Sequence, residues 1–164
     1  MTLEPLFSAS TEIQVHVAFA VIALLIGPVA LFRKRRDRLH KISGYTWVAG
    51  ITGLSVSGIF IPSEIAVIGQ FGPIHLFSLF ALWGVGAGMY WVWKGDIARH
   101  RAAMRSVWFG TMGLALLLQL LPGRVMNRMI FGEPSELGYL CIAIGGVWLF
   151  FGGRRQRQDQ HPLN

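Results

Sequence analysis

The chain has 164 residues, enough for one domain, and 53% of them are hydrophobic while only 14% are charged. This composition is typical of a membrane protein. The net charge is +7, but no base-stacking aromatic residues alternate with the basic runs, which argues against nucleic-acid binding. The single cysteine, Cys141, excludes an intrachain disulfide and a cysteine-rich metal or haem-attachment motif.

The first ten residues, MTLEPLFSAS, contain Glu4 and no basic side chain. They therefore lack the positively charged head of a secretory signal, and we expect them to stay on the mature protein.

Five stretches further along the chain contain no charged residue, at 13–32, 42–63, 65–93, 106–123 and 137–153. About 20 residues of helix cross a hydrocarbon core of about 30 Å, and tilt or local thinning accommodates somewhat shorter segments. The sequence therefore predicts an all-α, polytopic membrane protein with five transmembrane helices, at about 12–32, 40–61, 73–93, 101–121 and 137–152. We expect a single domain over 1–164, with the first four helices as a bundle, the fifth helix at its periphery and a polar cytoplasmic tail at 154–164.

The basic residues between these stretches predict the orientation. Thirteen of the fifteen Lys and Arg residues lie in three places: six from Arg33 to Lys41, four from Lys94 to Arg105 and three from Arg154 to Arg157. With five crossings these places share one side of the membrane, which the positive-inside rule makes the cytoplasmic side. We expect the bacterial inner membrane, with the amino terminus outside and the carboxyl terminus in the cytoplasm.

Four histidines lie at helix ends in a regular order. His16 and His75 fall at the outer ends of the first and third predicted helices, and His40 and His100 at the inner ends of the second and fourth. Alternate helices face each other diagonally across a four-helix bundle. Two imidazoles that face each other across a bundle can ligate one haem iron from opposite sides. The pattern predicts two b-type haems, one at each membrane level, in a transmembrane electron carrier.

Small and basic residues accompany these histidines. Gly44 follows His40 by one helical turn and leaves room beside it for a porphyrin, and further small residues either let the helices pack closely or leave similar gaps. Haem propionates are anionic and pair with basic side chains. For this role we expect Arg99 and Arg101 at the inner level, and Arg124 and Arg128 at the outer level.

Other interpretations of the same residues stay open. Polar residues at helix ends can serve solvation alone, and His40 and His100 lie near the basic interface, where they could contact lipid phosphate. A haem-free accessory subunit of a larger respiratory or photosynthetic complex, or a homo-oligomer, would suit the same composition. Gln14 and Gln119 permit a quinone site but do not require one. A transporter is disfavoured because none of the five stretches contains Asp or Glu, and if the protein is an enzyme we expect a membrane oxidoreductase.

An ordered series of motifs resembles a known family. The series runs VHVAFAVIALLIGPVALF, RLHKISGYTWVAG, FGPIHLFSL, KGDIARHRAAMR and LPGRVMNRMIFG, and it covers most of residues 10–133. It resembles the uncharacterised bacterial membrane proteins grouped as DUF2306, a family without an established activity. More distantly, the first two helices are similar to two-haem cytochrome b561-type electron carriers. That similarity implies His16, His40, His75 and His100 as haem ligands.

Overall fold

The structure is a computed structural model that describes residues 3–63, 65–132 and 135–158, with the backbone alone from 150 onward. Within these residues the regular secondary structure is helical, apart from one isolated bridge between Ile68 and Phe71, and the predicted all-α class is confirmed. Residues 159–164 of the predicted polar tail fall outside the described residues.

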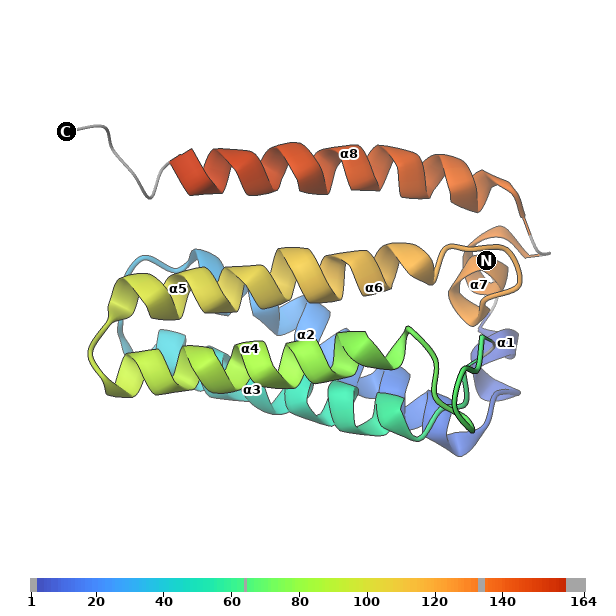
Figure 1. Cartoon of the computed structure of the whole chain (residues 1–164), viewed down its shortest axis with the longest axis horizontal. Coiled ribbons are helices and arrows are strands. Elements are labelled where there is room, and N and C mark those ends of the chain that lie inside the picture. The colour runs from blue at the N-terminus through green and yellow to red at the C-terminus, as the bar shows by residue number, and fades with distance from the viewer. Residues whose placement is uncertain (1–2, 64, 133–134, 159–164) are drawn as a thin grey trace. The chain divides into compact units, whose positions relative to one another are not determined.

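The helices follow the predicted order with some differences in their bounds (Figure 1). They are α1 (Glu4–Phe7), α2 (Thr11–Phe32), α3 (Arg38–Ile59), α4 (His75–Trp93), α5 (Ile97–Arg105), a π-helical segment η1 (Ser106–Met112), α6 (Gly113–Leu118), α7 (Val125–Phe131) and α8 (Leu137–Gln158). The fourth predicted helix thus begins four residues early, because the Asp96 side chain caps α5 by accepting a hydrogen bond from the Arg99 N–H at 2.9 Å. The fifth continues beyond the expected 152, and the short helices α1 and α7 and the π-helical turn were not predicted.

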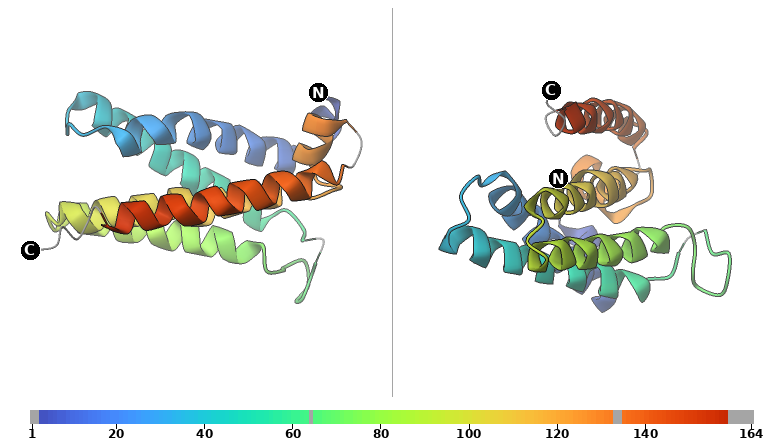
Figure 2. Two further views of the ribbon diagram at one scale, coloured as in Figure 1. Left: turned by 90° about the horizontal axis from the view of Figure 1, so that it is seen from above. Right: turned by 60° about the vertical axis from the view of Figure 1, so that its left-hand side comes forward.

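The chain divides into two compact units, and the first of them, residues 9–111, contains the four predicted ligand histidines. In this unit α2 packs on α3, α3 on α4, α4 on α5 and α5 on α2 (Figure 2). Helices α3 and α5 therefore lie diagonally across the group, as do α2 and α4. The buried core between them includes Ala23, Trp47, Ile51, Val85, Met104 and Val107.

Glycines let these helices approach closely. A Cβ atom at Gly53 would lie 2.5 Å from the Phe19 ring, and one at Gly84 would lie 2.5 Å from Val107. A Cβ at Gly27 would overlap the ring of Trp108, whose centroid is 6.4 Å from that of Trp47. These glycines therefore serve helix packing, the role that small residues commonly have in membrane bundles.

The second unit consists of the residues before Ala9 and those from Met112 onward. Within it α1 packs on α7, and α6 packs on α8. Its most buried polar side chain is Asn127 in α7, which is 0% exposed and binds backbone groups of the segments on either side of α7.

Two of the described helices, α2 and α4, are long and apolar enough to cross a membrane. The stretch Leu137–Leu149 of α8 is apolar but shorter. Many large apolar side chains of α2 and α4 face outward, among them Val21, Leu25, Phe80 and Trp83. Outward-facing apolar side chains are what a lipid environment requires of a spanning helix.

Candidate functional site

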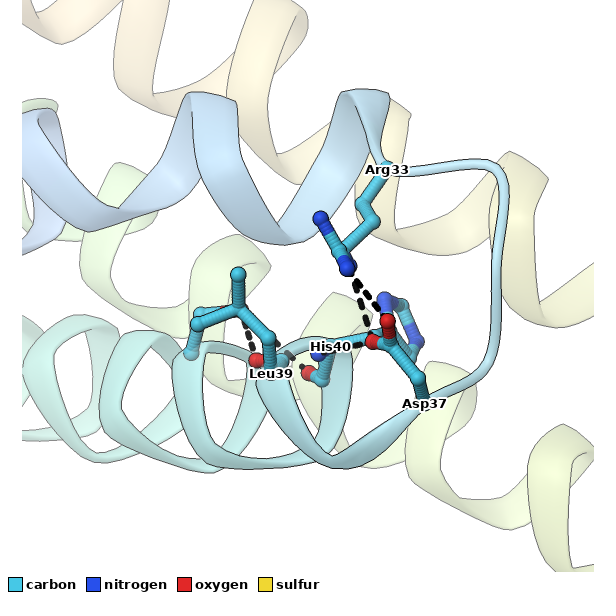
Figure 3. A network of polar contacts seen from close by, with 5 residues as sticks. Arg33, Asp37, Leu39 and His40 are labelled. Carbon is cyan, nitrogen blue, oxygen red and sulfur yellow. Dashed lines mark hydrogen bonds and ion pairs between the residues drawn. The ribbon is translucent and has the colours of Figure 1, made fainter.

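His40 lies in the first turn of α3, where Asp37 fixes the start of the helix (Figure 3). The Asp37 carboxylate accepts a hydrogen bond from the His40 backbone N–H at 3.0 Å and another from Arg33 Nε at 2.8 Å. A second contact joins Arg33 Nη2 to the other carboxylate oxygen. The Arg33 guanidinium, followed by the His40 N–H, holds the pKa of Asp37 well below its usual range. The basic loop between α2 and α3 is thus tied at both ends.

This arrangement predicts an acid-sensitive loop. Because the pKa of Asp37 is lowered in the folded protein, its stabilising contribution is complete above the ordinary Asp pKa of about 3.9 and is lost as the pH falls through the lowered value. We expect Asp37→Asn to flatten the acid side of the stability profile, measured by thermal unfolding in detergent from neutral pH downward. Arg33→Gln should produce the same flattening, because Arg33 is the largest cause of the shift. An unchanged acid profile in both variants would refute this role.

His100 lies in α5 and binds the backbone of α4. Its Nδ1 is 2.8 Å from the carbonyl oxygen of Gly88, and because a carbonyl only accepts, Nδ1 carries the hydrogen and donates it. With this hydrogen on Nδ1, the lone pair of Nε2 can face a ligand. Histidines that bind a metal through one ring nitrogen usually donate the N–H of the other ring nitrogen to a group such as a backbone carbonyl.

His40 and His100 line one cavity of about 180 Å³ at the basic end of the first unit. Its apolar walls include Val48, Met89, Val92 and Met104, and Gly44 and Trp47 of α3 also border it. Seven basic residues line it as well: Arg33, Lys34, Arg35, Arg36, Lys41, Arg101 and Arg105. Apolar walls with a basic rim suit an amphipathic anion.

Two side chains at this cavity contain buried polar atoms without a hydrogen-bond partner among the described residues, His40 Nδ1 and Trp47 Nε1. The residues are seven apart on α3 and so lie on the same side of that helix. Trp47 is only 1% exposed. Buried nitrogen atoms are almost always paired, so we expect each of these two atoms to bind a water molecule or a ligand in the cavity. The ring nitrogens, the open space at Gly44, where a Cβ would meet nothing within 4 Å, and the basic rim are the kinds of group that a haem site needs. The cavity of about 180 Å³ would have to widen to admit the whole macrocycle.

The histidines at the other end of the first unit have different surroundings. His16 Nδ1 lies 3.2 Å from Ser57 Oγ, and the Ser57 hydroxyl donates to the Gly53 carbonyl at 2.8 Å. The hydroxyl hydrogen is thereby used, so Ser57 accepts from His16 Nδ1–H. A Cβ at Gly58 would lie 3.1 Å from His16 Cε1, so this glycine makes room for the ring.

His75 uses both of its ring nitrogens for backbone contacts. The Gly72 N–H donates to His75 Nδ1 at 3.1 Å, and His75 Nε2 donates to the Ile61 carbonyl at 3.1 Å. The residue is buried, with 7% of its surface exposed. It joins the end of α3 to the start of α4 and has no lone pair left for a metal in this arrangement.

The four arginines that we predicted to bind haem propionates lie in different units of the chain, two in each. Arg101 lines the cavity beside His100. Arg99 lies instead over the Trp91 ring, 4.4 Å from its centroid, and 3.4 Å from the Asp96 carboxylate. Arg124, at the amino end of α7, and Arg128, within α7, belong to the second unit. Of the four, Arg101 has the surroundings that its predicted role requires.

Sequence reasoning missed three parts of the site. Asp37 stands immediately before α3, a position where its side chain often caps a helix, and this signal was available. Trp47 follows His40 by seven residues, and this spacing predicts that both side chains lie on the same side of the helix. The Gly88 carbonyl, which fixes His100, had no sequence signal. In the part of the chain that the structure describes, no group of three or more His, Cys, Asp or Glu side chains is placed to hold a metal ion.

Comparison with known proteins identifies the family but no activity. No curated protein and no solved structure matches the chain. The distant resemblance to cytochrome b561-type carriers therefore has no support from these comparisons. A family model described as predicted membrane protein (DUF2306) matches residues 13–151, which is most of the chain. The protein belongs to the DUF2306 family of predicted membrane proteins.

Proposed function

We propose that this protein is a membrane electron carrier that binds b-type haem in the cavity between α3 and α5, with His40 and His100 as the iron ligands. One observation carries the proposal: both histidines line the same cavity, and a basic rim surrounds them. The haem, when bound, would supply reversible one-electron chemistry at its iron.

The chain's own residues would orient the ligand. The hydrogen bond from His100 Nδ1 to the Gly88 carbonyl fixes the orientation and the tautomer of the ring. Asp37 holds the first turn of α3 and therefore the position of His40. Met89, Val92 and Met104 keep water from the apolar part of the cavity, and Arg101 and Arg105 offer charge-assisted hydrogen bonds to propionates.

The second haem of our sequence prediction, between His16 and His75, has less support. Binding there would require His75 to give up its contact with Gly72 or with Ile61. The proposal therefore rests on the inner pair, and a haem at the outer pair stays a prediction.

The proposal includes the five-span topology, with the basic cavity on the cytoplasmic side of a bacterial inner membrane. The distribution of Lys and Arg supports this orientation. Electrons would pass between a quinone or a periplasmic donor and an acceptor. The Gln14 amide, considered above for a quinone, donates to the carbonyl of Ala9, which lies two residues before α2, at 2.9 Å.

A pyridine haemochrome spectrum of the purified protein tests the proposal. Protein from a haem-sufficient host should show the Soret and α bands of b-type haem after reduction. Colourless protein would refute it. If that colourless protein co-purifies with a larger respiratory or photosynthetic complex, the alternative of an accessory subunit is favoured.

Filling the cavity should prevent haem binding without disturbing the helices. Gly44 borders the cavity, and its Cβ position meets no atom within 4 Å, so a Gly44→Leu side chain would occupy free space. We expect haem affinity to fall at least about tenfold, a loss of about 1.4 kcal/mol, measured by titration of haem into the apoprotein. The matched control is Gly86→Leu on α4, because Gly86 is exposed and its Cβ position is equally open. Equal haem affinity in both variants would place the haem elsewhere.

A further inference from the structure

The loop between α3 and α4 exposes apolar side chains at its tip. Ile65, Val67 and Ile68 are 69%, 72% and 76% exposed, which is more than most apolar residues of the spanning helices. Contiguous exposed apolar side chains mark a surface that contacts another apolar medium. These three residues form what we call the apolar tip.

The loop has a fixed shape, because its backbone groups bind one another. The Val67 N–H donates to the Phe71 carbonyl at 2.8 Å, and the Phe71 N–H donates to the Ile68 carbonyl at 3.0 Å. Gly69, with φ of +59°, permits the tight turn between them. A backbone that satisfies its own polar groups can approach lipid at a lower cost than an open loop.

His75 ties this loop to the helices. Its hydrogen bonds to Gly72 and Ile61 join the two ends of the loop, and its ring packs edge-on against Phe71 with centroids 5.1 Å apart. The apolar tip is therefore held in a set position relative to the first turn of α4. A loop that is fixed to the helix in this way can take up a defined depth in a membrane, whereas a flexible loop cannot.

The position of the loop along the chain indicates its surroundings. Helix α4 begins at His75 and is one of the two candidate membrane spans. No charged residue occurs between Ile65 and Trp93, and the nearest charged residue before this stretch in the sequence is Glu64, next to the apolar tip. Charged residues normally mark the point where a chain leaves the bilayer for water.

We propose that the apolar tip inserts into the lipid interface of the leaflet at the His75 end of α4, and that His75 sets its depth. The partner is the boundary between head groups and acyl chains, because irregular backbone is not tolerated in the hydrocarbon centre. His75 is then a positioning residue for a lipid anchor. This inference does not depend on haem binding.

Depth-dependent quenching tests the proposal on the full-length protein in phosphatidylcholine and phosphatidylglycerol vesicles. In a Cys141→Ser background, Ile68→Cys labelled with a fluorescent probe reports on the apolar tip. Leu25→Cys on α2, which is exposed within a candidate span, is the lipid reference, and Lys94→Cys is the aqueous reference. Brominated acyl chains should quench the probe at Ile68, and aqueous iodide should quench it several-fold less than at Lys94.

Two results would overturn the proposal. Iodide quenching at Ile68 equal to that at Lys94 would place the tip in water. Protection from iodide in native membranes, followed by iodide quenching equal to that at Lys94 in the vesicles, would show that a protein covers the tip. The role of His75 is tested separately: His75→Ala should raise iodide quenching at Ile68 and leave Lys94 unchanged, and no change at Ile68 would refute the positioning role.

Discussion

Replacing His100 by alanine should abolish haem binding at the inner cavity, with complete loss of its Soret absorbance. The expectation follows from the placement of His100 beside the cavity, with Nδ1 bound to Gly88 and Nε2 available as a ligand. The measurement is the haem content per polypeptide of the purified variant, determined as pyridine haemochrome. Added imidazole should restore part of the absorbance to His100→Gly, because a small ligand can replace a lost side-chain ligand but not a lost structural contact.

His75→Ala is the matched comparison. Because both ring nitrogens of His75 bind backbone groups, we expect this variant to retain the inner haem and to lose stability. A halved haem content would instead support the two-haem arrangement predicted from sequence. If His100→Ala retains its full haem content, His100 is not a ligand and the proposed inner site is refuted.

Replacing Asn127 by leucine should strongly destabilise the second unit. The Asn127 amide donates to the carbonyls of Leu120 at 2.8 Å and Ser135 at 3.0 Å, and its carbonyl oxygen accepts from the Ser135 N–H at 2.9 Å. Leucine has a similar size but can replace none of these bonds. Each buried group left unpaired costs about 1–3 kcal/mol, so we expect a loss of about 3–5 kcal/mol in the free energy of unfolding.

Ser135→Ala is the control for this prediction, because it keeps the backbone groups that bind Asn127 and removes only an exposed side-chain contact to Leu137. It should change stability by less than about 0.5 kcal/mol. Thermal unfolding in detergent, with hydrogen exchange of the α7 peptides, measures both variants. Equal stability of the two would show that the buried amide does not hold α7 in place.

The sequence predicted the helical class because charge-free stretches of membrane length are a strong, local signal. It also predicted that His40 and His100 would lie on diagonal helices, since that follows from helix order alone, and the structure places both at one cavity. It could not predict which hydrogen-bond partner each histidine ring nitrogen would have. His75 seemed a suitable ligand until the loop brought the Gly72 N–H and the Ile61 carbonyl to it, and those backbone groups have no signature in the residue pattern.

The second unit was the least predictable part. The stretch around Asn127 reads as a polar loop, because Arg124, Arg128 and two glycines interrupt its apolar residues. The structure forms α7 there and buries Asn127 completely. A buried asparagine that binds backbone on both sides of its own helix depends on long-range placement, which periodicity does not encode.

The π-helical turn at Ser106–Met112 has a consequence for the comparison of family members. A π turn arises when an α-helix accommodates one extra residue without breaking, so it amounts to an insertion hidden inside a helix. A relative that has one residue fewer between His100 and Leu117 would have lost this turn and not a surface loop. Alignments that keep α-helical periodicity across this stretch would displace the side chains on one side of it by about 100° around the helix axis. The ancestry of the family should be traced with a gap allowed at this position.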